Sequence, residues 1–156
     1  RILVCAPSNA GIDEILKRLT LSPKEGGGIF DETGKHFSPS IIRVGPNIHP
    51  DLAQYSLEYK ASQRMKVKQS QRNEDRVGIK HALLKESQVV CATQSVCGSR
   101  DMVSFHGGFD TVVIDEASQG VELSTLIPLR LGCQRLILVG DPRQLSATVI
   151  SKTAIE

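Results

Sequence analysis

The sequence predicts an α/β domain in which a parallel sheet is flanked by helices. Short apolar runs rich in β-branched residues, without regular polar alternation, are typical of strands covered on both faces. Between these runs lie segments with helical spacing, or with enough length for the crossover that parallel neighbours require. The predicted strands are residues 2–6, 41–44, 89–92, 112–114 and 136–139.

Two of the connecting segments are predicted as helices. Residues 122–131 are long enough for one crossover. A helix over about residues 10–20 would place apolar residues three and four apart on one face: Ile12, Ile15, Leu16 and Leu19. Both helices would lie against the sheet.

Two polar segments interrupt the alternation of strand and helix. Residues 21–40 contain three consecutive glycines and two prolines, and we expect a surface connection with a hairpin around residues 32–35. Residues 51–86 are predicted as a short polar and basic helical insertion. Between positions 60 and 86, eight Lys or Arg stand against three acidic residues. Such a stretch is either a solvated helix or a surface along a nucleic-acid backbone, and the sequence leaves both open.

Composition sets limits on class. The 156 residues suffice for one domain, and a net charge of +2 gives no global argument for an acidic partner. No run approaches the roughly 18 apolar residues that span a membrane, and no signal peptide opens the chain, so an intracellular protein is expected. Four cysteines lie far apart without a CxxC pair and are predicted as buried free thiols rather than zinc ligands: Cys5, Cys91, Cys97 and Cys133.

The strongest chemical signal is a pair of adjacent acids directly after a predicted strand. Asp115 and Glu116 would emerge at the carboxyl edge of a parallel sheet, where open α/β folds bind ligands. Such acids can divide the work, because one can bind magnesium through water while the next orients or deprotonates an attacking water. The alternative is a strand that ends in acids without function.

A second polar segment follows the strand at 136–139. Gly140 would allow a tight turn, Asp141 could bind loop amides, and Gln144 could detect a terminal phosphate. An ordinary Gly-Asp-Pro turn is the alternative. Because the two segments have the spacing of neighbouring strands, the functional interpretation is favoured.

Small polar residues follow two further strands. Ser8 and Asn9 come after the first strand and open the first helix, where they could grip a phosphate of a nucleic-acid strand. Helix capping is the structural alternative. Thr93 follows another strand at the same predicted edge.

These blocks, in this order, resemble superfamily 1 helicases of the group that includes senataxin and the nonsense-mediated-decay helicase. The resemblance runs from residue 1 to about 149. Residues 5–9 are similar to motif Ia, 115–119 to motif II, and 139–145 to motif III; residues 123–129 resemble the senataxin-type segment between the last two.

The resemblance implies a RecA-like P-loop NTPase domain and a role for each residue. Asp115 would hold the magnesium of Mg-ATP, and Glu116 would activate water. Gln144 would sense the γ-phosphate, and Asp141 would couple that site to the nucleic-acid path. Three residues would contact a bound single strand of RNA or DNA: Ser8, Asn9 and Thr93.

The resemblance also implies the context of the activity. ATP and Mg²⁺ would be the cofactors, and unwinding of RNA or RNA–DNA duplexes in the 5′ to 3′ direction would be the reaction. A monomeric motor is expected, in the nucleus rather than the cytoplasm, and no protein partner is implied.

Two departures from the family pattern limit this prediction. Ser146 and Ala147 stand where many members have two prolines, so the loop of motif III would be less stiff. No GxxxxGK followed by Ser or Thr is present, so residues 1–156 are expected to be part of a first motor domain without the phosphate-binding loop or the second motor domain, and inactive alone. A non-translocating P-loop ATPase and a binding module without catalysis are the alternatives.

Overall fold

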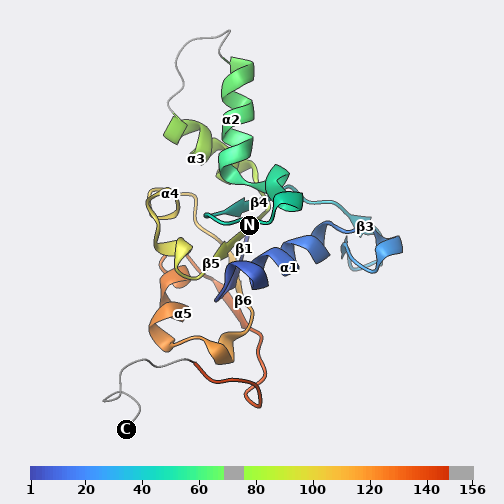
Figure 1. The fold of residues 1–156 in the computed structure, drawn as a ribbon, viewed down its shortest axis with the longest axis vertical. Coiled ribbons are helices and arrows are strands. Elements are labelled where there is room, and N and C mark those ends of the chain that lie inside the picture. The colour runs from blue at the N-terminus through green and yellow to red at the C-terminus, as the bar shows by residue number, and fades with distance from the viewer. Residues whose placement is uncertain (69–75, 148–156) are drawn as a thin grey trace.

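A sheet of five parallel strands forms the centre of the computed structural model, which describes residues 1–68 and 76–147 (Figure 1). The strand order is β4-β5-β1-β6-β7, and every neighbouring pair is parallel. The predicted α/β class with a parallel sheet flanked by helices is therefore confirmed. The strands are β1 (Ile2–Ala6), β4 (Ile41–Val44), β5 (Val89–Thr93), β6 (Thr111–Ile114) and β7 (Arg135–Leu138).

Helices cover both faces of the sheet. Successive strand residues point to opposite sides, so each strand contributes apolar side chains to both faces. On β1, Leu3 and Cys5 belong to one apolar cluster, while Val4 and Ala6 belong to the other. The first cluster includes residues of α3 (Arg76–Glu86) and α4 (Arg100–Val103), and the second includes Ile12 and Leu16 of α1 (Asn9–Thr20).

The two predicted sheet helices are present with small shifts. Helix α1 begins at Asn9, one residue before the prediction, and α5 spans Glu122–Leu129, which is shorter than predicted. Pro128 lies in the last turn of α5 and has no N–H to donate to the carbonyl one turn earlier. The 3-10 segments η3 (Val96–Gly98) and η4 (Ala117–Gln119) complete the loops after β5 and β6.

The hairpin predicted within residues 21–40 is confirmed. After η1 (Pro23–Glu25), strands β2 (Ile29–Phe30) and β3 (His36–Phe37) pair antiparallel. Gly34 takes the left-handed backbone that this turn requires, with φ 79°. The hairpin lies beyond the carboxyl end of α1, away from the sheet (Figure 1).

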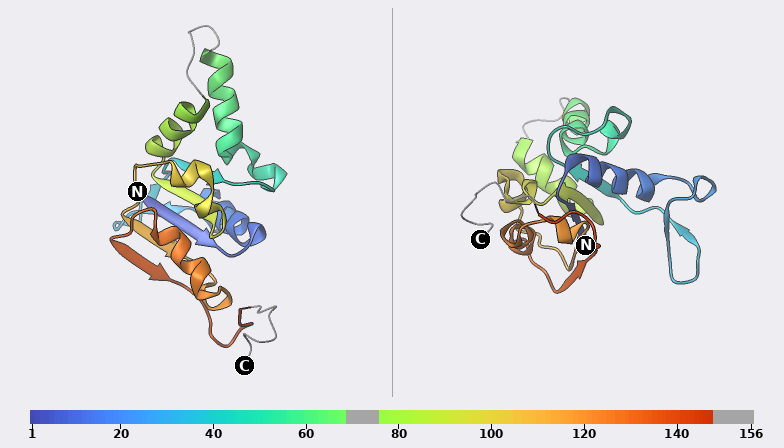
Figure 2. Two further views of the ribbon diagram at one scale, coloured as in Figure 1. Left: turned by 90° about the vertical axis from the view of Figure 1, so that its left-hand side faces the viewer. Right: turned by 60° about the horizontal axis from the view of Figure 1, so that its bottom comes forward.

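Residues 50–86 contain η2 (Pro50–Tyr55), α2 (Leu57–Lys68) and α3, which rise from the β4 side of the sheet (Figure 2). Helices α2 and α3 contact each other, and they bury a few apolar side chains that the weak periodicity of this stretch does not reveal: Leu57, Ala61, Ile79 and Leu84. The insertion is therefore anchored by tertiary contacts rather than fully solvated.

Four of the basic residues whose side chains the structure describes in this insertion bind groups of the protein itself. Arg64, for example, forms two parallel hydrogen bonds to Glu86, at 2.8 and 2.9 Å. The same holds for Lys60, Arg76 and Lys80, which bind a carbonyl oxygen or carboxylates. A nucleic acid would have to compete with these partners, and binding along the insertion stays a prediction.

The opposite edge of the sheet is apolar and exposed. The side chains of β7 are uncovered on both faces, with Leu136 and Ile137 each 41% and Leu138 55% exposed. No strand in the described part of the chain pairs with the outer side of β7.

The cysteines are free, as predicted, and three of them are buried. Burial raises the pKa of the Cys91 thiol to about 12, which keeps it protonated and unreactive at neutral pH. Cys133 is partly exposed. Over the described ranges, no group of three His, Cys, Asp or Glu side chains could hold a metal ion, and no helix is long and apolar enough to cross a membrane.

Candidate nucleotide and nucleic-acid site

The parallel strands bring the predicted residues to one edge of the sheet. Thr93 is the last residue of β5 and pairs in register with Ala6, the last residue of β1. Ser8 comes two residues after Ala6, just beyond the end of this neighbouring strand. Strand β6, which leads to Asp115, pairs with the other side of β1, and β7 lies next to β6. The residues predicted to contact a nucleic-acid strand and the residues predicted to bind the nucleotide therefore occupy adjacent halves of the same edge of the sheet.

The two acids leave β6 in different ways. The Asp115 N–H donates to the Cys5 carbonyl at 2.8 Å, so this residue continues the ladder with β1. No hydrogen bond to its carboxylate comes from a residue that the structure describes. Glu116 turns into the left-handed region, with φ 51° and ψ 39°, and its carboxylate accepts a hydrogen bond from the Gln119 amide at 2.8 Å. A left-handed backbone at a glutamate costs energy and is typical of functional loops.

The loops after β6 and β7 are fastened to each other. The Ala117 N–H donates to the Val139 carbonyl at 2.8 Å, and the Ser118 hydroxyl donates to the Asp141 carbonyl at 3.1 Å. Gly140 lies between them, and a Cβ at this position would be 2.9 Å from the Ser118 nitrogen. Its backbone φ is not positive, so the backbone conformation alone does not require a glycine here. The glycine is needed because the two loops approach so closely.

The loop that follows Gly140 is exposed and is held by hydrogen bonds between its own residues. The Asp141 carboxylate accepts a hydrogen bond from the Arg143 N–H at 2.9 Å, as predicted for an aspartate that binds loop amides. The Gln144 N–H donates to the Asp141 carbonyl at 3.0 Å. The Gln144 side chain is exposed and has no partner among the described residues.

Ser8 and Asn9 have structural partners at the start of α1. Ser8 caps the helix, since its hydroxyl oxygen accepts a hydrogen bond from the Gly11 N–H at 3.0 Å. Asn9 is half-buried, and its side-chain oxygen accepts a hydrogen bond from Arg43 at 2.8 Å. The capping alternative therefore holds for Ser8, whose O–H group remains available as a donor.

Thr93 lies at the predicted edge but is only 6% exposed. Its hydroxyl oxygen accepts a hydrogen bond from the Val96 N–H at 3.3 Å and so supports the turn into η3. Next to it, Gln94 is 2% exposed and its side-chain nitrogen has no hydrogen-bond partner among the described residues. A contact between Thr93 and a bound strand stays a prediction.

Sequence reasoning missed a buried ion pair behind Asn9. Arg43 is fully buried on β4, and its Nε donates to an Asp13 carboxylate oxygen at 2.9 Å. The second Asp13 oxygen accepts a hydrogen bond from the His49 N–H at 2.9 Å. The signal that could have revealed it is an arginine inside the otherwise apolar four-residue strand.

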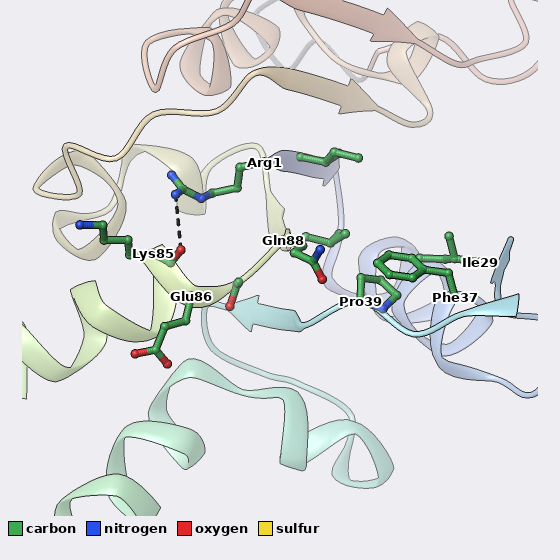
Figure 3. Close-up of a pocket in the computed structure, with 10 residues that line it drawn as sticks. Arg1, Ile29, Phe37, Pro39, Lys85, Glu86 and Gln88 are labelled. Atoms are coloured by element: carbon green, nitrogen blue, oxygen red, sulfur yellow. Dashed lines mark hydrogen bonds between the residues drawn. The ribbon is translucent and has the colours of Figure 1, made fainter. Parts of the chain in front are cut away.

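A cavity of about 460 Å³ lies at the other end of the strands and contains none of the predicted residues. Its lining includes the starts of β1 and β5, together with Lys85, Glu86 and Phe37 (Figure 3). Because ligands of open α/β sheets bind at the carboxyl ends of the strands, this cavity is not the candidate site.

The residues present fit part of a Mg-ATP site. Asp115 offers carboxylate oxygens, the ligand type that Mg²⁺ prefers, and Mg²⁺ completes its shell with water and phosphate rather than with many protein groups. Glu116 lies one residue further on. The sequence contains no GxxxxGK followed by Ser or Thr, the pattern that cradles phosphates, so the chain would supply only the acidic half of such a site.

Comparison with known proteins places the chain in a family. A family model described as an AAA domain matches residues 1–80 and 69–152. The chain belongs to this family, among the superfamily 1 helicases related to senataxin. This membership agrees with the observed sheet, and the fold is that of a RecA-like P-loop domain.

Relatives in this helicase family match along nearly the whole chain. It is 44% identical to "probable helicase MAGATAMA 3" of Arabidopsis thaliana over 99% of its length, and 38% identical to a "probable helicase" of Dictyostelium discoideum over 100%. It is 29% identical to "probable helicase senataxin" of Homo sapiens, again over 100%. The chain spans 19%, 18% and 8% of these three relatives.

Proposed function

We propose that this helicase-family chain is part of an ATP-dependent motor and supplies both the acids of Mg-ATP hydrolysis and contacts to a single strand. The observation that carries the proposal is the fastening of the Asp115–Glu116 loop to the Gly140–Gln144 loop at the carboxyl edge of the sheet. Two loops of this kind, joined by hydrogen bonds, can act together on one nucleotide.

Each residue has a task that suits its surroundings. The free carboxylate of Asp115 would hold magnesium, with water molecules in between. Magnesium bound there supplies positive charge that stabilises the transferring phosphoryl group. The Glu116 carboxylate would accept a proton from the attacking water, with Gln119 fixing its orientation. The exposed Gln144 amide would detect the terminal phosphate, and Asp141 would pass that state to the neighbouring loop.

The bound nucleic-acid strand would lie along the start of α1. The Ser8 hydroxyl and the Asn9 amide each have donor hydrogens without a described partner, which suits contact with phosphate oxygens. We propose single-stranded RNA or DNA as the partner, unwinding of RNA or RNA–DNA duplexes in the 5′ to 3′ direction, action as a monomer and a nuclear location. Duplexes that carry a 5′ or a 3′ overhang test the direction.

The first experiment is nucleic-acid-stimulated ATP hydrolysis by the full-length protein, comparing the wild type with Glu116→Gln. We expect turnover to fall by at least a hundredfold while ATP binding is retained, because the variant loses the proton acceptor but keeps its shape. The matched control is Glu122→Gln, which makes the same change at the start of α5. Wild-type turnover in Glu116→Gln would refute the assignment and favour a binding module without catalysis.

A further inference from the structure

A buried arginine lies directly behind the start of α1. Arg43 is 0% exposed, and its Nε and Nη2 donate to the side-chain oxygens of Asp13 at 2.9 Å and Asn9 at 2.8 Å, while its Nη1 donates to the Val44 carbonyl. Gly45 lies against it, since a Cβ there would be 3.2 Å from Nη1. The guanidinium group is enclosed and held on each of its nitrogens.

This arrangement determines which end of the Asn9 amide faces outward. A guanidinium group is a donor only, so the group that meets it must be the acceptor oxygen of the amide. The Asn9 nitrogen, with its two N–H groups, then points away from Arg43, and no described residue accepts a hydrogen bond from it. An asparagine without such a partner could present either end.

We infer that Arg43 is a positioning residue for nucleic-acid binding: it fixes the Asn9 amide with its N–H groups toward the bound strand. Phosphate oxygens are acceptors, so this orientation attracts the backbone of the strand, and the reversed amide would repel it. Asp13 holds Arg43 in turn, and is itself fixed by the His49 N–H. The inference rests on the proposed function, because it takes Asn9 as a strand contact.

Stability alone gives a weak reason for this network. A buried ion pair is often no more stabilising than well-packed apolar side chains of similar volume. In this network Arg43 also donates a hydrogen bond to the half-buried Asn9 amide at the candidate site. This bond selects one of the two amide orientations, which apolar packing cannot do.

A double-mutant cycle on the full-length protein tests the inference. The measurement is the anisotropy of a fluorescein-labelled oligo-uridine with the wild type, Asn9→Ala, Arg43→Lys and the double variant. Lysine keeps the charge but cannot fork to two acceptors as arginine does. We expect Asn9→Ala to weaken binding about tenfold and Arg43→Lys about three- to tenfold. In the Asn9→Ala background, Arg43→Lys should cause no further loss.

A second variant avoids the buried position. Asn9→Gln keeps both amide ends but moves them by one methylene, out of reach of the fixed guanidinium group. We expect it to bind as weakly as Asn9→Ala, although it retains the N–H donors. This arm decides the question if Arg43→Lys does not fold. Ile12→Val, a buried change in the same helix that removes no hydrogen bond of this network, controls for a general loosening of α1 and should bind like the wild type.

The outcomes separate the inference from the function on which it rests. If Arg43→Lys causes the same loss with and without Asn9, or if Asn9→Gln binds like the wild type, Arg43 is structural only and the inference is overturned. If Asn9→Ala binds oligo-uridine as tightly as the wild type, the strand contact of the proposed function is itself wrong, and the inference falls with it.

Discussion

The Ser118 hydroxyl donates a hydrogen bond to the Asp141 carbonyl, 3.1 Å away, and so joins loops that follow two different strands. One loop carries Glu116, and the other carries Gln144. A displacement of either loop must therefore strain or break this contact. For the roles proposed for Glu116 and Gln144, this contact would provide a short physical path between the two loops, through main-chain and hydroxyl groups.

Gly140→Ala is expected to separate these loops. The added methyl group would lie 2.9 Å from the Ser118 nitrogen and 3.1 Å from the Ala117 nitrogen, which is main chain and cannot move aside cheaply. We expect a loss of about 1–3 kcal/mol in the free energy of unfolding, together with reduced ATP turnover of the full-length protein. The matched control is Gly78→Ala in α3, where no atom lies within 4 Å. Thermal melting should show this control to be about 0.5–1 kcal/mol more stable.

Gln119→Ala is expected to slow catalysis without preventing nucleotide binding. Gln119 holds the Glu116 carboxylate at 2.8 Å, and its removal lets that carboxylate rotate. A misplaced general base lowers turnover, and we expect a fall of about tenfold in kcat with ATP affinity unchanged. Gln54→Ala, at an exposed position of η2, provides the control. Equal kcat values for Gln119→Ala and the control would show that this hydrogen bond does not orient the base.

Asp13→Ala and Glu14→Ala are neighbouring changes with opposite expected outcomes. Removal of Asp13 leaves the fully buried Arg43 without its carboxylate, which we expect to cost about 3–5 kcal/mol. Glu14 pairs with Arg18 on the exposed face of the same helix, and its loss should give no measurable change. Urea denaturation of both variants tests this contrast. Similar unfolding midpoints would mean that the buried pair is not what fixes α1 to β4.

The contacts of α2 with α3 predict a pH dependence. Partial burial alone would raise the pKa of Glu58, but hydrogen bonds from Lys80 and Arg76 outweigh it and lower the pKa below the ordinary 4.5. The stabilisation from Glu58 is therefore complete above pH 4.5 and is lost as the pH falls through the lower, folded-state pKa.

Lys80 gives the opposite sign. Burial lowers its pKa, but the bonds to Asp101 and Glu58 outweigh this and raise the pKa above 10.5, so its contribution is lost only above that pH.

Thermal melting of Glu58→Gln should show a deficit in stability relative to the wild type at pH 7, and this deficit should disappear toward pH 3. Glu32→Gln in the hairpin serves as the control. A deficit independent of pH would mean that the charge of Glu58 does not matter.

The five strands of the main sheet and their order along the chain could be predicted because each is a short, mainly apolar run. Their parallel alignment then follows from the crossovers, and it carries Asp115, Glu116 and Ser8 to one edge without any further information. The sequence therefore predicts the location of those polar residues that directly follow a strand.

The partners of polar side chains could not be predicted in this way. Arg43 and Asn9 are separated by 34 positions, and only the folded sheet places one behind the other. Likewise, the acids that pair with Lys80 come from α2 and α4, so a count of basic residues in one stretch overstates the charge it presents. The burial of Thr93 depends on the turn into η3, which no local pattern indicates.

Strand β7 has a consequence for handling the chain in solution. Its backbone groups on the outer side are unpaired within the described residues, and the leucine and isoleucine side chains beside them face water above and below the sheet. An exposed, apolar edge of this kind is a template on which a strand of another molecule can add. Preparations of the chain alone should accordingly become turbid as concentration rises, and Ile137→Lys should delay that onset.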